Sequence, residues 1–213
     1  MGAKTWMLVY SNGAIPNLWS KGLKINRESS TKIIKTLFST KQYSAIEDGN
    51  LYYTNPPKDV IYAADLGELI ILATDEIAID NPSKISQRFI DFSEYKYLYL
   101  FAMHSVVDWF AFAVWENKKL IRSLSISPDN GVIEDYGNRF PFEQDYWKGE
   151  YPVTDSESED TYPLPFHPLD FGESALLKLM GFQYEGIENL NRIDPETIPL
   201  VGFKEKKSGW KFW

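Results

Sequence analysis

The sequence predicts an α+β protein with a mixed central β-sheet, helices packed on its faces and a long irregular, aromatic-rich C-terminal segment. Three observations predict this class. Short apolar runs rich in β-branched and aromatic residues are interleaved with helical patterns in the first half of the chain. A central hairpin is apolar on both faces, which indicates a sheet covered on both sides. After residue 131, aromatic residues continue without a clear period.

The first half opens with a β-α-β pattern and continues with a hairpin. A helix over residues 30–38, capped by Ser29 or Ser30, follows the first strand. The tetrapeptide Asp65-Leu66-Gly67-Glu68 is a plausible hairpin turn. The interleaving of this hairpin with helices favours a mixed sheet. The predicted strands are residues 5–11, 43–46, 60–64 and 69–74.

The middle of the chain holds a second helix and the best-defined hairpin. The helix is predicted over residues 82–92, with Asn81 as N-cap and Pro82 in its first turn. The hairpin joins residues 107–116 to residues 119–127 through Asn117-Lys118, a two-residue loop in which Asn tolerates a positive φ.

The last third is irregular, acidic and rich in aromatic residues. Residues 155–160 read as a solvated acidic loop, and residues 162–168 as a stiff, proline-rich segment. A helix follows, with Asp170 as N-cap, Glu173 completing a capping box and Gly181 at its end. Residues 198–203 form a further short strand. We expect a single domain over residues 1–213, with a mobile tail over about residues 204–213.

Composition excludes several classes of function. The 213 residues carry a net charge of −8 and include no cysteine, so disulfides, thiolate nucleophiles and cysteine-bound metals are absent. The acidic balance disfavours a nucleic-acid or anionic-membrane partner. The apolar stretch 97–115 carries Asp108 near its centre, which is costly in a bilayer. No signal-peptide pattern is present at the start. We therefore expect a soluble, cytoplasmic protein.

Several long strings resemble one uncharacterised bacterial family, a domain of unknown function. They are the Met-Gly-Ala-Lys-Thr start, Ala-Met-His-Ser-Val-Val-Asp-Trp-Phe-Ala-Phe-Ala-Val-Trp-Glu at 102–116, the 122–128 string and Tyr-Pro-Leu-Pro-Phe-His-Pro at 162–168. The resemblance covers nearly the whole chain. It implies a bacterial cytosolic protein and carries over no activity, cofactor or catalytic residue.

His104, Ser105 and Asp108 suggest a serine hydrolase. On one strand His104 and Ser105 would point to opposite faces, which prevents a Ser–His hydrogen bond. A turn at residues 104–106 would remove that obstacle, because a strand of twenty residues is unusually long. No Gly-x-Ser-x-Gly elbow is present. The competing structural interpretation is that these polar side chains only cap the end of a strand.

A metal site is a second interpretation of the same residues. His104 and His167 are the only histidines, and with Asp108 or Glu134 they would form a two-His-one-carboxylate site. No local ligand spacing supports this pairing. Structural use of each imidazole is the competing interpretation. We predict no cofactor. A bound divalent metal is the less favoured alternative.

Arg122 is the candidate for anion binding. The hairpin register places it across from Ala113 on the face of Trp115, where a guanidinium needs a partner. A salt bridge to Glu134 or Glu150, or stacking on Trp115, satisfies that need. The functional interpretation is that the planar guanidinium of Arg122 binds a carboxylate or phosphate of a ligand.

The aromatic residues after residue 131 form either a cover over the core or a binding surface. Trp147 is the one included among the candidate pocket residues. The full candidate set is His104, Ser105, Asp108, Arg122, Glu134, Trp147 and His167.

Two functions from different classes follow. The first is a binding or interaction protein that recognises a protein partner or a small anionic ligand, and an immunity-protein role fits the same properties. The second is a hydrolase or metal-assisted enzyme that uses His104, Asp108 and His167.

Overall fold

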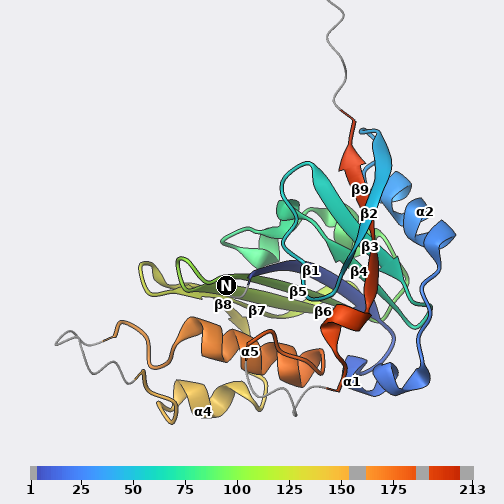
Figure 1. Cartoon of the computed structure of the whole chain (residues 1–213). Coiled ribbons are helices and arrows are strands. Elements are labelled where there is room, and N and C mark those ends of the chain that lie inside the picture. The colour runs from blue at the N-terminus through green and yellow to red at the C-terminus, as the bar shows by residue number, and fades with distance from the viewer. Residues whose placement is uncertain (1–3, 154–161, 186–191, 207–213) are drawn as a thin grey trace, which may run out of the picture.

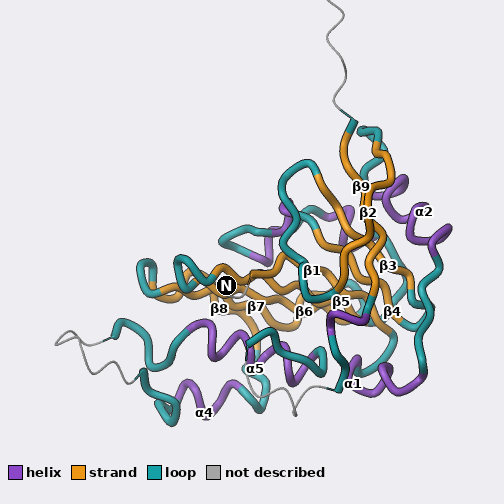
Figure 2. The backbone as a smooth tube through the Cα atoms, viewed as in Figure 1, coloured by secondary structure: helices purple, strands orange, loops and turns teal. Residues whose placement is uncertain are grey.

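The computed structural model describes residues 4–153, 162–185 and 192–206, which build one nine-stranded sheet (Figures 1 and 2). The strand order is β2-β9-β3-β4-β1-β5-β6-β7-β8. The strands are β1 (Lys4–Ser11), β2 (Tyr43–Asn50), β3 (Val60–Asp65), β4 (Leu69–Ala73), β5 (Tyr97–His104), β6 (Trp109–Glu116), β7 (Lys119–Ser127), β8 (Gly131–Gly137) and β9 (Pro199–Glu205).

The described helices are short, and most of the regular structure is in the nine-stranded sheet, so the protein has a sheet-rich α+β fold. The α-helices are α1 (Ile15–Leu18), α2 (Arg27–Leu37), α3 (Gln87–Asp91), α4 (Glu143–Trp147) and α5 (Pro168–Leu179). Single 3₁₀ turns are η1 (Trp19–Lys21), η2 (Asp75–Ile77), η3 (Pro82–Lys84) and η5 (Pro195–Thr197).

Every pairing of neighbouring strands among the described residues is antiparallel, so the sheet is not mixed. The reason lies in the β-α-β pattern of the first half. Strands β1 and β2 are its two strands, but β4, β3 and β9 lie between them. Hairpins supply four pairings, the late return of β9 supplies two, and β1 pairs with β4 and β5 to join the two halves of the sheet; all of these pairings are antiparallel.

Two apolar layers cover the sheet on opposite faces. Helix α5 packs on β5 and β6, and α2 packs on β3 and β9 on the other face. In Figure 1, α5 and α4 lie below the sheet and α2 lies at the right beside β3 and β9. Gly172 of α5 lies against Phe110 of β6, because a Cβ there would come within 2.7 Å of the Phe110 ring.

Helix boundaries differ from the predicted ones where side chains choose other caps. Helix α2 begins at Arg27 because Asn26 caps it by accepting from the backbone N–H of Ser29. His167 caps α5 by accepting from the N–H of Leu169, so Asp170 is not the N-cap. Gly181 ends this helix with a φ of +88°, as predicted.

The predicted helix over residues 82–92 is two short elements, η3 and α3. Ile85 has an extended backbone between them, with φ −52° and ψ 146°. This break lets both Ile85 and Phe89 enter the core beneath α2. Asn81 is the N-cap of η3 as predicted, although its side chain makes no cap hydrogen bond.

The central hairpin has the predicted turn and a different register. Asn117 and Lys118 both have positive φ, and Trp115 pairs with Leu120 as predicted. Beyond this pair a bulge adds one residue to β7, so Arg122 pairs with Val114 rather than Ala113. One extra residue moves each following side chain to the other face. The predicted face for Arg122 was therefore wrong.

The C-terminal part contributes an interior strand. Lys204 and Glu205 belong to β9, so the predicted tail over about residues 204–213 begins too early. Its remainder after Lys206 and the acidic loop 155–160 lie outside the described residues. The single-domain organisation stays a prediction.

The apolar stretch 97–115 is not a helix. It forms β5, the turn at residues 105–108 and most of β6. Within the described ranges, no helix is both long enough and apolar enough to cross a membrane.

Candidate functional site

The seven candidate residues do not converge on one pocket. His104, Ser105 and Asp108 lie at the turn between β5 and β6, and His167 reaches that turn from the opposite face of the sheet. Arg122 is buried under the sheet beside α4, and Glu134 lies on β8. The set is therefore split among separate places.

His104 ends β5 on the face that carries α2 and α3. Its ring lies 5.7 Å from the Trp6 ring. Its Nδ1 accepts a hydrogen bond from the backbone N–H of Val106 at 3.2 Å. Burial, and then the charge of Lys4, lowers the pKa of His104, so the imidazole is neutral near pH 7. In this neutral form the proton is on Nε2.

His167 lies on the α5 face and contacts Asp108, with 3.6 Å between Nε2 and Oδ2. Its Nδ1 accepts from the Leu169 N–H at 3.3 Å, and its ring stacks on Tyr162. A neutral His167 therefore also has its acceptor nitrogen in use and its proton on Nε2. The predicted Asp108–His167 proximity is present, but His104 lies on the other face.

The Nδ1 atoms of both histidines are engaged in local hydrogen bonds. In both imidazoles the nitrogen that could accept a proton or bind a metal already caps a turn or a helix. Among the residues that the structure describes, no three side chains of the metal-ligating types lie close enough to hold an ion. The structure places His104 and His167 on opposite faces of the sheet, and their pairing as metal ligands stays a prediction.

Arg122 is fully buried and its donors are taken inside the protein. Its Nη2 donates to Glu143 at 2.6 Å and its Nε to the same carboxylate at 2.9 Å. Its Nη1 donates to Asp135 at 2.6 Å and to the carbonyls of Ser123 and Tyr136. The salt-bridge interpretation is confirmed, with Glu143 and Asp135 as partners instead of Glu134 or Glu150. All three guanidinium nitrogens donate inside the protein, and the side chain is fully buried, so an external anion has no access to it.

Glu134 and Trp147 have local structural contacts. Glu134 accepts from the backbone N–H and hydroxyl of Ser83 and from the hydroxyl of Ser123, which ties η3 to the sheet. Trp147 lies edge-on against Phe166 and under the guanidinium of Arg139 at 4.0 Å. Neither side chain faces the turn that carries His104.

A pocket of about 470 Å³ opens at the end of the sheet where His104 lies, and we call it the strand-end pocket. Adjacent strands supply its walls at the point where each begins or ends. Its lining residues are Trp6, Ala78, Asp80, His104, Val107, Trp109, Ser127, Asp129, Asn130 and Ile133. Its volume is in the usual range for ligand sites.

Aromatic rings form the walls of the strand-end pocket. The Trp6 and Trp109 rings lie 6.4 Å apart at an angle of 42°. The Trp109 N–H donates to the hydroxyl of Ser125, which fixes that indole. Sequence reasoning missed Trp6, because its position beside His104 depends on the pairing of β1 with β5. No local sequence signal reports that pairing.

The lining of the strand-end pocket carries negative charge, although Lys4 lies close enough to act on His104, and the rim of the pocket is apolar. The lining includes the exposed carboxylates of Asp80 and Asp129 and no lysine or arginine. Val106 and Val107 on the neighbouring turn are 74% and 48% exposed. An opening with carboxylates and exposed valines suits a partner that brings positive charge and apolar surface.

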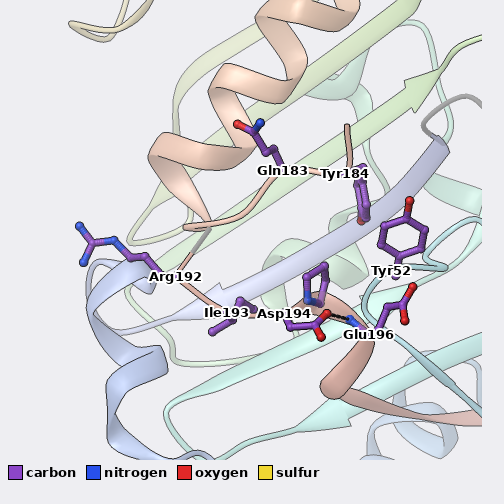
Figure 3. Close-up of a pocket in the computed structure, with 8 residues that line it drawn as sticks. Tyr52, Gln183, Tyr184, Arg192, Ile193, Asp194 and Glu196 are labelled. Carbon is purple, nitrogen blue, oxygen red and sulfur yellow. Dashed lines mark hydrogen bonds between the residues drawn. The ribbon is translucent and has the colours of Figure 1, made fainter. Parts of the chain in front are cut away.

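A second pocket of about 600 Å³ lies near the end of α5 (Figure 3). Tyr52 and Tyr184 line it with their rings in edge-to-face contact, and Arg192 points away from them. The Tyr184 hydroxyl already contacts Thr54 at 2.6 Å, and burial raises the pKa of Tyr184 to about 12. The Asp194 carboxylate caps η5. These polar groups serve the fold, which makes the strand-end pocket the better candidate.

The fold and the site define an antiparallel-sheet α+β protein with an acidic, aromatic pocket at one end of its strands. The chain belongs to a family of unknown function, DUF6928, whose model matches residues 5–203. This confirms the resemblance to an uncharacterised family. Comparison with curated proteins and with solved structures gave no match. The bacterial origin stays a prediction.

Proposed function

We propose that this chain is a non-catalytic binding protein that holds a cationic group of a protein partner in the strand-end pocket. The lining of that pocket carries the proposal. Trp6, Trp109 and a neutral His104 form its walls, and Asp80 and Asp129 supply negative charge. Indole faces and carboxylates both attract cations.

The geometry supports binding over hydrolysis. A general base needs a free acceptor nitrogen, and those of His104 and His167 accept backbone N–H groups. The hydrolase or metal-assisted alternative requires both caps to break before any chemistry begins. The anionic-ligand alternative required Arg122, whose guanidinium is buried and paired with Glu143 and Asp135.

A protein partner fits the surface next to the pocket. Val106 and Val107 are large apolar side chains that are 74% and 48% exposed. Both lie in the turn between β5 and β6, and Val107 lines the pocket. Such apolar contacts around a buried anchor are typical of protein interfaces.

Site-specific photocrosslinking in the source cells tests this proposal. A benzoylphenylalanine at Val107, on the pocket rim, is compared with one at Tyr53, which is 51% exposed and lies outside the pocket. We expect a discrete protein adduct from position 107 and none from position 53. Changing Asp80 and Asp129 to Asn should lower the yield at position 107. Equal yields at both positions, or a yield unaffected by loss of both carboxylates, would contradict the proposal.

A further inference from the structure

Strand β2 forms one edge of the sheet, and among the described strands it pairs with β9 alone. The carbonyl of Gln42 accepts from the N–H of Lys206 across this pair, in the same register as the rest of the pairing. Backbone groups alternate in direction along an antiparallel strand. Tyr43 and Ala45 therefore direct their N–H and C=O groups away from β9, to the open side of the sheet.

A pocket of about 380 Å³ lies along this edge, between β2 and α2, and we call it the edge groove. Figure 1 shows β2 and α2 beside each other at the right of the sheet. Ile34 and Phe203, which are 2% and 4% exposed, give the groove an apolar floor. Tyr43 and Ala45 also line it, on the face of the sheet that α2 covers. A strand added outside β2 would therefore place every second side chain along the open side of the groove.

The rim of the edge groove is positive, although the whole chain has a net charge of −8. Lys35, Lys41 and Lys206 line the groove and are exposed, and its lining includes no carboxylate. Lys41 forms an ion pair with Glu205 at 2.8 Å, whereas Lys35 and Lys206 form none with the described residues. Lysines next to an apolar floor suit a ligand that carries both carboxylates and apolar side chains.

We infer that the edge groove binds an extended acidic segment of a partner protein, which adds to β2 as a further strand. The outward backbone groups of β2 bond the main chain of the segment, and the groove selects its side chains. An apolar residue packs beside Ala45, and a carboxylate two residues away lies on the same face, toward the lysines. The bulge between Ile46 and Gly49 keeps the paired segment short.

This inference goes beyond the proposed function. No residue lines both the edge groove and the strand-end pocket, and the two linings carry opposite charges. The two sites can therefore be tested separately.

Selection from a displayed library of random octapeptides, with the full chain as target, tests the charge preference. We expect enrichment of peptides in which a carboxylate lies two positions from an apolar residue. Lys35→Glu should weaken binding of the enriched peptide at least tenfold. Lys178→Glu is the matched control, because both lysines lie in the last turn of a helix and Lys178 is on α5, outside the groove. It should leave the affinity unchanged.

A second set of measurements tests strand addition. Ala45→Pro removes an outward N–H at a position where an edge strand tolerates proline, and should weaken peptide binding at least tenfold. Ala45→Ser keeps that N–H and should bind normally. Urea unfolding confirms that each variant is folded. N-methylation of successive peptide residues, measured with the unchanged chain, should weaken binding only at alternate positions, because alternate N–H groups face β2.

Four results would overturn the inference. The first is a library that yields no peptide, or yields basic ones. The second is peptide binding that neither Ala45→Pro nor N-methylation affects. The third is a dimer of this chain that Ala45→Pro dissociates, which would assign the edge to a second copy. The fourth is saturable binding of decanoate that Lys35→Glu abolishes and Ala45→Pro does not, which would assign the lysines to a small anion.

Crosslinking from position 107 reports on the strand-end pocket alone. If that crosslink forms while the edge groove binds no peptide, the inference fails and the proposed function stands.

Discussion

At the scale of single residues, the buried pair of Arg122 and Glu143 shows how a charge can lie under the sheet. Both side chains are fully buried, and the Glu143 carboxylate also accepts from the Phe140 N–H at 2.8 Å. Asp135 and two backbone carbonyls accept from Nη1 of the same guanidinium. A buried charge without such partners would carry its full desolvation cost. The network fixes α4 against the sheet.

We predict that Glu143→Gln lowers the free energy of unfolding by about 3 kcal/mol, because it leaves the Arg122 charge buried with less compensation. Urea unfolding measures the change. The control on the same helix is Asp145→Asn, which breaks an exposed pair with Lys148 and should cost at most about 1 kcal/mol. Similar losses of unfolding free energy for both variants would show that the buried Arg122–Glu143 pair stabilises the fold no more than an exposed pair does.

Glu173 is a second residue whose environment decides its chemistry. It is 9% exposed, and its carboxylate accepts from the backbone N–H groups of Tyr184 and Glu185. Burial raises the pKa of Glu173 from 4.5 to about 7, and the two hydrogen bonds offset only part of this effect. Between these two pH values the folded protein keeps a proton that the unfolded chain releases.

The contribution of Glu173 to stability is therefore present below about pH 4.5 and is lost as the pH rises through 7. Glu173→Gln is neutral at every pH and lacks this dependence. We expect the difference between the unfolding free energies at pH 5 and pH 8 to be smaller in this variant by on the order of 2–3 kcal/mol. Urea titrations at both pH values provide the measurement. The same pH dependence in both proteins would contradict the raised pKa.

At the scale of elements, α5 depends on a glycine that would normally weaken a helix. A Cβ on Gly172 would lie 2.7 Å from the Phe110 ring and 3.0 Å from the Met103 sulfur. The helix can therefore approach β5 and β6 closely only because this position lacks a side chain. The cost of glycine to the helix, about 1 kcal/mol, is offset by that contact.

We predict that Gly172→Ala destabilises the protein by roughly 1–3 kcal/mol, because overpacking outweighs the gain in helix propensity. Gly13→Ala is the matched control, since a Cβ there meets nothing within 4 Å and should change stability by less than about 1 kcal/mol. Thermal or urea unfolding compares them. A stabilised Gly172→Ala variant would mean that α5 does not pack as closely as described.

Sequence patterns predict some of these elements correctly and not others. The hairpin β3–β4 and the turn Asn117-Lys118 form as predicted, because turn residues act locally. The bulge in β7 has no local signature, and it moves Arg122 to the face opposite the predicted one. For the same reason the structure divides the predicted site residues among separate places in the fold. These residues are chemically distinctive, but their faces depend on register and pairing.

At the scale of the whole molecule, the last described strand completes the sheet. Strand β9 lies between β2 and β3, so the sheet closes only after the chain reaches residues 199–205. Gly202 fits between its neighbours because a Cβ there would lie 2.3 Å from the carbonyl oxygen of Glu47. Figure 1 shows β9 running upright beside β2 and β3.

We predict that the amides of β9 exchange hydrogen as slowly as those at the centre of β5, although β9 is late in the chain. Residues 200–203 and 100–103 are all buried in interior strands, so both sets should exchange only through global unfolding. Native-state hydrogen exchange measures the opening free energies. The edge strand β8 should exchange faster. Exchange of β9 at the rate of β8 would show that β9 opens independently.

The sequence alone determined the α+β class, most of the strands, the turn chemistry and the pool of chemically distinctive side chains, because periodicity and turn residues act over short distances. Tertiary structure alone decided the antiparallel order, the register of β7 and the partners of Arg122. It also decided that Trp6, His104 and Trp109 share a pocket, while His167 lies across the sheet. These features depend on pairings between residues far apart in the chain, which no local pattern specifies.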